Sequence, residues 1–358
     1  MPKKKSKSST KKNFLRQVFE LDCYYNRVLE KAIKANQALG DYPDHFEFPI
    51  GLQYELTTKC NLKCKHCYNY SGENTKEDRM TPEDWLALSK HIVKHGGLFE
   101  CIISGGEPLL LGDKLLPIMD TFHEDGSFFV FITNGFLLDK EWAKKLKKYL
   151  YDWFQISIDG HTPDLHDEFR GVKGSFEKAV KAVFHMANEG IHVRIAHSVS
   201  RANMNYLDEM AELAYNIGAS SIIMGESSPS GRGFLHRNEI ELNQEEYGKV
   251  CKKMNKLTQQ YEGRMEILRS SFTKIQLKYY QIQPTGVAII RPDGNVRLDC
   301  MAPFVMGNVK ERPFVDIWRE KSSKCWQDKR VVEYVNSIRG SRSESSLIRN
   351  YVDKDVFI

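Results

Sequence analysis

The sequence lacks a long apolar run, and this absence argues against a helix that crosses a membrane. No stretch is long and apolar enough to span a bilayer, which takes about 20 residues. The lysine-rich start is not followed by an apolar segment, so it does not predict a secretory signal peptide. Low-complexity segments and short tandem repeats are absent as well. We therefore expect a globular protein, and 358 residues are enough for one large domain and a smaller unit.

The sequence also lacks the cysteine pattern of a disulfide-bonded secreted protein. It has eight cysteines, of which three fall within eight residues. The others are scattered along the chain as Cys23, Cys101, Cys251, Cys300 and Cys325. Disulfide-rich secreted domains are short and carry paired cysteines throughout. The pattern therefore predicts a reducing, cytoplasmic compartment.

The net charge of +5 belongs to a short amino-terminal arm. Six of the 52 Lys and Arg residues lie in MPKKKSKSSTKK, so the rest of the chain sets 46 Lys and Arg against 47 Asp and Glu. Such an arm is typical of a solvated, disordered tail. It could instead contact nucleic acid, and a non-catalytic metal-binding protein with a nucleic-acid-binding tail stays open as an alternative. We do not expect nucleic acid to be the main partner.

Strand-like and helix-like segments alternate from about residue 51 to residue 226. A helix over 14–38 precedes them, and the sequence Thr81-Pro82-Glu83 has the residues of a helix start. The predicted strands are 51–57, 99–104, 128–132, 153–158, 191–199 and 219–225. The predicted helices between them are 81–95, 113–125, 139–149, 175–189 and 205–217. This order predicts an α/β fold, a partial (β/α)6 TIM-like barrel, with its active site at the carboxyl ends of the strands.

Three cysteines follow the first predicted strand at the spacing CX3CX2C. They are Cys60, Cys64 and Cys67, in the run TTKCNLKCKHCYNY. Three soft sulfur ligands on one short loop suit an iron–sulfur cluster or zinc. A structural zinc site has four ligands, and His66 or Cys101 could supply the fourth. Three ligands alone would leave one metal position open for chemistry.

Small polar and charged residues follow the next predicted strands. Because parallel strands end at one edge of a sheet, these residues should gather around the cysteine loop. Adjacent glycines let a backbone approach a ligand closely, and a guanidinium suits a carboxylate. The residues are Gly105, Gly106 and Glu107, then Thr133 and Asn134, then Ser157 and Asp159, and finally Arg170 in DEFRGVKGSF.

The run CNLKCKHCY resembles the signature of the radical S-adenosylmethionine (radical SAM) enzymes. The resemblance implies one [4Fe–4S] cluster on the three cysteines, with S-adenosylmethionine on its open iron. One electron then cleaves the cofactor to a 5′-deoxyadenosyl radical. The resemblance also implies that the strand-end residues bind the cofactor, with Glu107 at its amino group and Arg170 at its carboxylate. Flavodoxin or ferredoxin would be a suitable electron donor.

The pattern changes after residue 226. The run GVAIIRPDGNVRLDC predicts a β-hairpin that turns at 292–295. Together with MGNVKERPFVDIW it resembles the SPASM or twitch extension of peptide-modifying radical SAM enzymes. Relatives carry auxiliary clusters there, but Cys300 and Cys325 alone cannot form a four-thiolate site. We therefore expect a small α+β extension over 227–358 without an auxiliary cluster, after a barrel over 49–226 and an arm with a helix over 1–48.

The resemblance favours a ribosomally made peptide as the substrate, changed by epimerisation or crosslinking. A radical SAM epimerase or dehydrogenase of a sugar or another small molecule stays open. Without an auxiliary cluster to take an electron, a redox-neutral reaction is attractive. Cys300 is then the candidate catalytic residue, because a thiol can give a hydrogen atom to a substrate radical. The alternative for Cys300 is a small buried apolar side chain.

Overall fold

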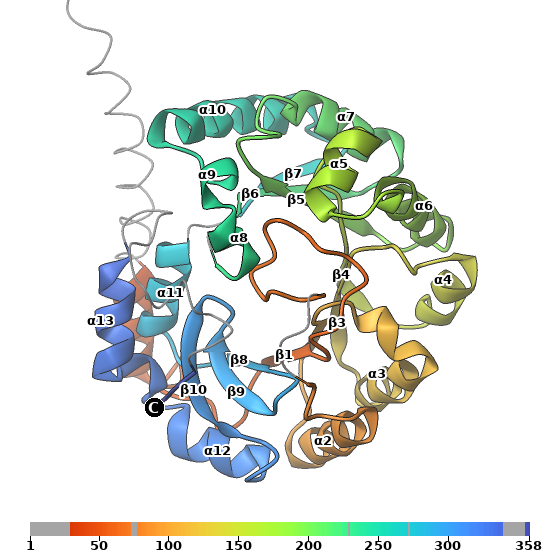
Figure 1. Ribbon diagram of the computed structural model, residues 1–358. Coiled ribbons are helices and arrows are strands. Elements are labelled where there is room, and N and C mark those ends of the chain that lie inside the picture. The colour runs from red at the N-terminus through yellow and green to blue at the C-terminus, as the bar shows by residue number, and fades with distance from the viewer. Residues whose placement is uncertain (1–28, 73–76, 228–229, 271–272, 339–354) are drawn as a thin grey trace, which may run out of the picture.

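One mixed sheet runs through the whole molecule. The computed structural model describes residues 29–72, 77–227, 230–270, 273–338 and 355–358. The sheet has the strand order β11-β10-β9-β8-β1-β2-β3-β4-β5-β6-β7. From β1 to β7 the neighbouring strands are parallel and follow chain order, which is the arrangement of a β/α barrel that does not close. Figure 1 shows the helices around the outside of this curved sheet.

Strands and helices alternate along the barrel part. The strands are β1 Gly51–Glu55, β2 Glu100–Ser104, β3 Phe128–Thr133, β4 Tyr151–Ser157, β5 Val193–Val199, β6 Ser221–Glu226 and β7 Glu266–Arg269. The helices are α2 Pro82–His95, η1 Pro108–Lys114, α3 Leu115–Glu124, α4 Lys140–Leu146, α5 Pro163–Arg170, α6 Ser175–Asn188, α7 Leu207–Asn216, α8 Arg232–Leu235, α9 Arg237–Ile240 and α10 Gln244–Gln260.

The carboxyl-terminal part adds a smaller set of elements to the same sheet. They are α11 Thr273–Ile282, β8 Val287–Ile290, β9 Asn295–Asp299, β10 Ala302–Asn308, α12 Phe314–Lys321, η2 Cys325–Gln327, α13 Lys329–Ser337 and β11 Val356–Phe357. Strand β8 lies parallel to β1, while β9 is antiparallel to both β8 and β10. The extension is therefore continuous with the barrel sheet.

Side-chain caps start the helices where the sequence predicts them. The Thr81 hydroxyl accepts from the Asp84 amide at 3.2 Å, and the Asp84 carboxylate accepts from the Thr81 amide at 2.9 Å. Pro82 occupies the first turn of α2, where a missing N–H costs nothing. Asp139 caps α4 in the same way, through the Trp142 amide at 2.9 Å. These caps satisfy N–H groups that have no partner inside the helix.

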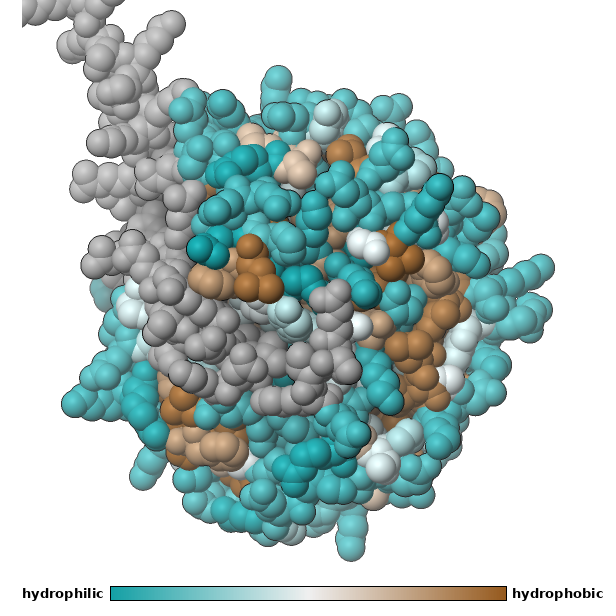
Figure 2. Space-filling model, viewed as in Figure 1, coloured by the Kyte–Doolittle hydropathy of each residue, from teal (hydrophilic) through white to brown (hydrophobic). Residues whose placement is uncertain are grey.

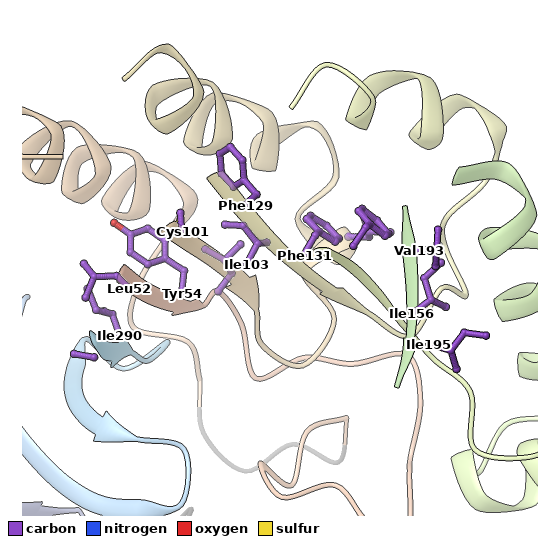
Figure 3. Packing of buried hydrophobic residues seen from close by; sticks show 14 of the residues in the cluster. Leu52, Tyr54, Cys101, Ile103, Phe129, Phe131, Ile156, Val193, Ile195 and Ile290 are labelled. Carbon is purple, nitrogen blue, oxygen red and sulfur yellow. The ribbon is translucent and has the colours of Figure 1, made fainter. Parts of the chain in front are cut away.

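The hydrophobic core lies between the sheet and its surrounding helices. Alternate residues of each strand point to the same face, so strand register places one apolar row beside the next. Figure 3 shows this row in Leu52, Tyr54, Cys101, Ile103, Phe129, Phe131, Ile156, Val193, Ile195 and Ile290. Residues of the opposite parity face the inside of the curved sheet. Side chains that belong to the core therefore point away from the inside of the curved sheet. Only side chains of the opposite parity can line a site there.

The α/β fold with a partial barrel is confirmed, and the predicted strands and helices agree with the observed ones within a few residues. Helix α5 and strand β7 are not predicted by the sequence pattern. Strand β7 pairs with β6, so the parallel sheet continues past residue 226. The predicted hairpin is present as β8 and β9, with Gly294 in the turn at a φ of 89°. Of the predicted 14–38 helix, residues 29–39 are helical and the rest lies outside the described residues.

The surface is mostly polar. Figure 2 shows a largely hydrophilic face on which apolar side chains gather in separate patches. The helices in the described part of the chain are all too short or too polar to cross a membrane.

Candidate active site

The cysteine loop crosses the carboxyl ends of the barrel strands. Cys60, Cys64 and Cys67 follow β1 and line one cavity of about 280 Å³. In Figure 1 this loop, in orange, lies at the centre of the ring of helices beside α8. The cavity is also lined by Ser104, Gly105, Gly106, Thr133, Asn134, Gln155, Ser157, Arg170, Ala196 and Ser198. Residues far apart in the sequence thus meet around the three sulfurs.

Each of the three sulfurs accepts a hydrogen bond. The Leu62 amide donates to Cys60 Sγ at 3.4 Å, and the Ser71 amide donates to Cys67 Sγ at 3.3 Å. Arg170 Nη1 donates to Cys64 Sγ at 3.5 Å. Donors directed at sulfur stabilise metal-bound thiolates and tune the potential of an iron–sulfur cluster. The loop therefore fits the ligand set of a cluster.

Burial makes Cys60 and Cys64 poor free thiolates. It raises the pKa of Cys60 to about 12, with a further contribution from the charge of Glu107. Burial also raises the pKa of Cys64, although Arg170 acts in the opposite direction. Metal binding must therefore release protons from this loop, as is usual for thiolate sites.

The two candidates for a fourth zinc ligand, Cys101 and His66, both make contacts with other residues. Cys101 is fully buried in the hydrophobic core beside Tyr54, as Figure 3 shows. His66 lines the cavity, but its ring stacks on Phe169 at 4.7 Å and its Nε2 is 3.7 Å from Asp159 Oδ2. The geometry therefore favours three sulfur ligands with an open position over a closed zinc site.

Gly105 and Gly106 let the end of β2 pack against the cysteine loop. The Gly106 amide donates to the Thr57 carbonyl at 2.6 Å, and the Glu107 amide donates to the Lys59 carbonyl at 2.9 Å. A Cβ on Gly106 would collide with the carbonyls of Thr58 and Lys59. The glycines also line the cavity, so one backbone serves both the loop and the ligand space.

Glu107 lies behind the cavity wall. Its fully buried carboxylate accepts from Thr133 Oγ1 at 2.8 Å, the Asn134 amide at 2.9 Å and the Leu109 amide at 3.2 Å. Burial raises the pKa of Glu107 to about 7, although these donors act in the opposite direction. The carboxylate thus ties the end of β2 to the end of β3. A contact between Glu107 and the cofactor stays a prediction.

Asn134 connects the end of β3 to the cysteine loop. Its Nδ2 donates to Asn61 Oδ1 at 2.9 Å and lies 3.7 Å from Cys60 Sγ. Its Oδ1 accepts from the Phe136 amide at 2.8 Å, which fixes the orientation of the side chain. Thr133 is turned toward Glu107. Asn134 is therefore the member of this pair that reaches the sulfurs.

Arg170 and Asp159 form a buried ion pair. Arg170 Nε lies 2.7 Å from Asp159 Oδ2, and Asp159 Oδ1 accepts from the Ser198 amide at 2.7 Å. Burial opposes the charge of Asp159, but the charge of Arg170 holds its pKa below the usual range. Arg170 and Ser157 line the cavity, while Asp159 holds Arg170 from behind. Both members of this ion pair are buried, so it is not a surface ion pair.

Buried histidines surround this ion pair in neutral form. Burial lowers the pKa of His66 to about 4 and that of His166 to about 4. His197 has a pKa lowered by the same cause, and its Nδ1 is 3.0 Å from the Ile158 carbonyl. His166 Nδ1 accepts from the Asp159 amide at 3.2 Å, which requires the neutral ring. The charge of Asp159 is therefore directed mainly to Arg170.

Gln155, Ala196 and Ser198 line the cavity but are not identified by motif reasoning. Strand parity could have found them. Phe154, Ile156 and Ile195 belong to the apolar row, so their neighbours along β4 and β5 face the inside of the sheet.

Cys300 lies in the turn between β9 and β10, half-buried. Burial first, and then the charges of Asp299 and Glu55, raise its pKa well above the usual range. Glu55 accepts from Tyr68 at 3.0 Å and from Asn69 at 3.4 Å, and both of these residues line the cavity. Cys300 itself is not among the residues that line the cavity. Cys325 is elsewhere, buried against Thr285 at 3.4 Å.

Two family models match the chain. The radical SAM superfamily matches residues 54–214, and an iron–sulfur cluster-binding domain of the SPASM family matches residues 282–338. The first range contains the cysteine loop and the strand ends around it. The second contains Cys300 and Cys325.

The curated proteins that resemble this chain in sequence differ in the kind of molecule that their names give as the product. Fe-coproporphyrin III synthase of Methanosarcina barkeri is 27% identical over 328 residues, which are 84% of this chain and 78% of the relative. The antilisterial bacteriocin subtilosin biosynthesis protein of Bacillus subtilis is 32% identical over 192 residues, 53% of this chain and 42% of that protein. The similarity to the first protein therefore extends over most of this chain, and the similarity to the second over about half of it.

Solved structures share the fold. SuiB of Streptococcus suis bound to its precursor peptide SuiA has a TM-score of 0.62 at 15% identity, covering 83% of this chain and 68% of SuiB. At that identity the likeness concerns the arrangement of strands and helices alone.

Proposed function

The chain belongs to the radical SAM superfamily, and on that premise we propose that it modifies a ribosomally made peptide by abstracting a hydrogen atom from it. Cys60, Cys64 and Cys67 would hold one [4Fe–4S] cluster, and the adjoining cavity would hold S-adenosylmethionine. Once bound and reduced, these groups supply the radical that abstracts the hydrogen atom. The proposal rests above all on three sulfurs that face one cavity, each with its own hydrogen-bond donor.

The residues around the cavity suit an amino-acid cofactor with a ribose. Arg170 carries a charge for a carboxylate and is held in place by Asp159. Ser157, Ser198 and Gln155 offer hydroxyl and amide groups to ribose hydroxyls. The glycine pair leaves room for the ligand to approach the backbone.

Two observations favour a peptide as the substrate. They are the percentage identity to the bacteriocin biosynthesis protein and the buried carboxylates near the cavity. The bacteriocin biosynthesis protein shares 32% of aligned residues with this chain, against 27% for the coproporphyrin enzyme. Behind the cavity wall, Asp299 and Glu55 are buried carboxylates, while Arg291 lies 3.9 Å from Glu55 and offsets one of them. Peptide N–H groups are compatible with such an acidic wall, whereas a polyanion is repelled.

A tetrapyrrole is the second candidate substrate. The observation that favours a tetrapyrrole is the share of the relative's length that aligns with this chain. The match spans 78% of Fe-coproporphyrin III synthase but only 42% of the bacteriocin biosynthesis protein. Coproporphyrin carries several propionates, and its binding would call for cationic side chains in addition to Arg291 and to Arg170, which is assigned to the cofactor. The two candidates are therefore separable by direct binding and turnover with each substrate.

Cys300 would return a hydrogen atom to the substrate. Its S–H bond breaks as the new C–H bond forms, which leaves a thiyl radical on sulfur. One electron from a flavodoxin- or ferredoxin-type donor and one proton then restore the thiol. A hydrogen-atom donor must be protonated, and the raised pKa of Cys300 keeps it so. The outcome is epimerisation, and crosslinking is the alternative. Such a reduced, oxygen-sensitive system points to the cytoplasm.

The test is turnover of a candidate precursor peptide, encoded beside this chain, in deuterated water. Epimerisation through Cys300 predicts a gain of about one mass unit, and Cys300→Ser should still form 5′-deoxyadenosine while the peptide gains no deuterium. A loss of about two mass units would indicate oxidation instead. Normal deuterium incorporation by Cys300→Ser would reject its role. Turnover of coproporphyrin but of no peptide would replace the first candidate by the second.

A further inference from the structure

The segment after β6 folds back onto the cysteine loop. It contains α8 and α9, and Figure 1 shows α8 beside the orange loop that follows β1. In the sequence this segment is the loop-like run that contains Gly231-Arg232-Gly233. Neither the fold nor the proposed reaction explains why an arginine stands there.

Arg232 is buried and bonded to the cysteine loop at several points. Its Nη1 donates to the Cys64 carbonyl at 3.2 Å and to the Ser71 carbonyl at 3.1 Å, and its Nη2 donates to the Ser71 carbonyl at 2.6 Å. Its amide donates to the Cys67 carbonyl at 2.9 Å. The guanidinium also lies 5.0 Å from the ring centroid of Tyr70. One side chain thus joins two points of the loop on either side of Cys67.

The contact needs the local backbone as well. Gly231 has a φ of 55°, and a Cβ there would collide with the carbonyls of Tyr68 and Cys67. Tyr70 has a φ of 56°, an uncommon backbone conformation for a residue with a side chain. Ser71, whose carbonyl accepts from Arg232, also donates its amide N–H to Cys67 Sγ at 3.3 Å. Arg232 therefore holds the residue whose N–H points at the sulfur, through the next peptide group along the chain.

The cysteine loop is held from its other side by α5. The Lys63 amide donates to the Arg170 carbonyl at 3.0 Å, and the Lys65 amide donates to the Phe169 carbonyl at 2.9 Å. Lys65 also joins the two sides, because its Nζ is 2.9 Å from Glu168 on α5 and 3.2 Å from Glu239 on α9. The loop thus lies between Arg170 and Arg232, two buried cations.

We propose that Arg232 is a positioning residue for the iron–sulfur cluster, which fixes the cysteine loop and stabilises the reduced cluster with its buried charge. The inference rests on the proposed cluster at Cys60, Cys64 and Cys67. Reduction adds one negative charge to the cluster, and a cation in a water-poor site stabilises that charge. The arginine fork can span two carbonyls at once, whereas a lysine keeps the charge but not the span.

The test compares the reconstituted full chain with Arg232→Met and Arg232→Lys. Two properties are measured, the midpoint potential of the cluster and its rate of loss to an iron chelator. Arg237→Met is the matched control, because Arg237 is an exposed arginine of the same segment that stacks on Phe234 at 4.3 Å. Melting of each apoprotein reports on the fold without the cluster.

Arg232→Met should lower the midpoint potential and lose iron about tenfold faster or more, as expected for charged hydrogen bonds. Arg232→Lys should keep a potential near that of the wild type and still lose iron faster. Wild-type potential and iron loss in Arg232→Met would overturn the proposal. So would a fall in apoprotein melting temperature with no change in potential, since that marks a general fold residue. A wild type without any cluster would instead reject the proposed function.

Discussion

At the scale of single residues, the ion pair of Arg170 and Asp159 depends on its neutral neighbours. His66, His166 and His197 surround Asp159, and burial lowers the pKa of each. A protonated histidine there would compete with Arg170 for the carboxylate, and a protonated His166 would also lose the hydrogen bond that its ring accepts from the Asp159 amide. The orientation of Arg170 toward Cys64 is therefore sensitive to acid.

The first prediction concerns His166 and acid stability. Its folded pKa of about 4 lies below the unfolded value of about 6.5, so the unfolded chain binds more protons between these values. The stability that the neutral ring contributes is present above pH 6.5 and is lost as the pH falls. From pH 7 to pH 5 the loss is about 2 kcal/mol. His166→Gln keeps an acceptor and cannot ionise, so it should lack this loss.

The measurement is urea unfolding of the apoprotein at pH 7 and at pH 5. The free energy of unfolding of His166→Gln should gain on the wild type by about 2 kcal/mol over this range. His192→Gln, at an exposed histidine, is the control and should track the wild type. A parallel decline of His166→Gln and the wild type would show that His166 is not held neutral.

At the scale of elements, the loop after β1 and the turn after β2 are built against each other. The Gly106 and Glu107 amides donate to carbonyls of the cysteine loop, and Asp78 accepts from the Thr58 amide at 2.8 Å. These bonds position the cysteine loop. The spacing of the cysteines is thus supported by backbone contacts from a neighbouring strand.

The second prediction is that Gly106→Ala will impair cluster binding. The added methyl group collides with the Thr58 and Lys59 carbonyls, so the loop must move, at a cost of about 1–3 kcal/mol. Iron and sulfide content after anaerobic reconstitution should fall. Gly126→Ala is the control for general destabilisation, because its φ of 89°, which Gly106 does not share, strains the backbone while a Cβ there has open space. It should lose about 1 kcal/mol of stability and keep its iron. Equal iron in both variants would contradict this account of Gly106.

The sequence predicts the helices and strands better than it predicts which way their side chains point. Thr81-Pro82 marks the start of α2 because capping and a fixed proline φ act locally. Helix α5 has the same local start signal in Thr162-Pro163 and ends at Gly171, whose φ is 73°, so its residues do encode it although the strand–helix alternation does not predict it. Strand β7 is missed because it is short and depends on its pairing with β6. The strand-end motifs locate the site, since parallel strands end at one edge. Glu107 behind the wall and Arg232 above the loop depend on contacts between distant segments, which sequence spacing does not encode.

At the scale of the whole molecule, one sheet joins the barrel to the extension. Leu52 and Tyr54 of β1 lie opposite Ala288 and Ile290 of β8. Helix α12 adds a second link, because Trp318 Nε1 donates to the Phe46 carbonyl at 2.9 Å. Separate unfolding of the extension would expose an edge of β1 and its core row. The barrel and the extension should therefore behave as one cooperative unit.

The third prediction is that the barrel and the extension will unfold together. Cys101 in the barrel core and Cys325 in the extension are both buried and serve as natural probes. Thiol labelling of the apoprotein across a urea series, read for each cysteine by mass spectrometry, should give the same midpoint for both. Labelling of Cys325 well before Cys101 would show that the extension opens on its own.

The fourth prediction concerns the number of clusters. Anaerobically reconstituted wild type should hold about four iron and four sulfide per chain, which is the content of one [4Fe–4S] cluster. About eight iron per chain, with half of it retained after Cys60, Cys64 and Cys67 are replaced, would establish a second cluster in the extension.

The central claim is that the cavity at the cysteine loop cleaves S-adenosylmethionine reductively. The most direct measurement is the 5′-deoxyadenosine formed from S-adenosylmethionine and dithionite under anaerobic conditions. The reconstituted wild type should form it, even slowly without substrate, and the variant Cys60→Ala, Cys64→Ala, Cys67→Ala should form none. A wild type that holds its cluster but forms no 5′-deoxyadenosine, or a triple variant that forms it at the wild-type rate, would contradict the account.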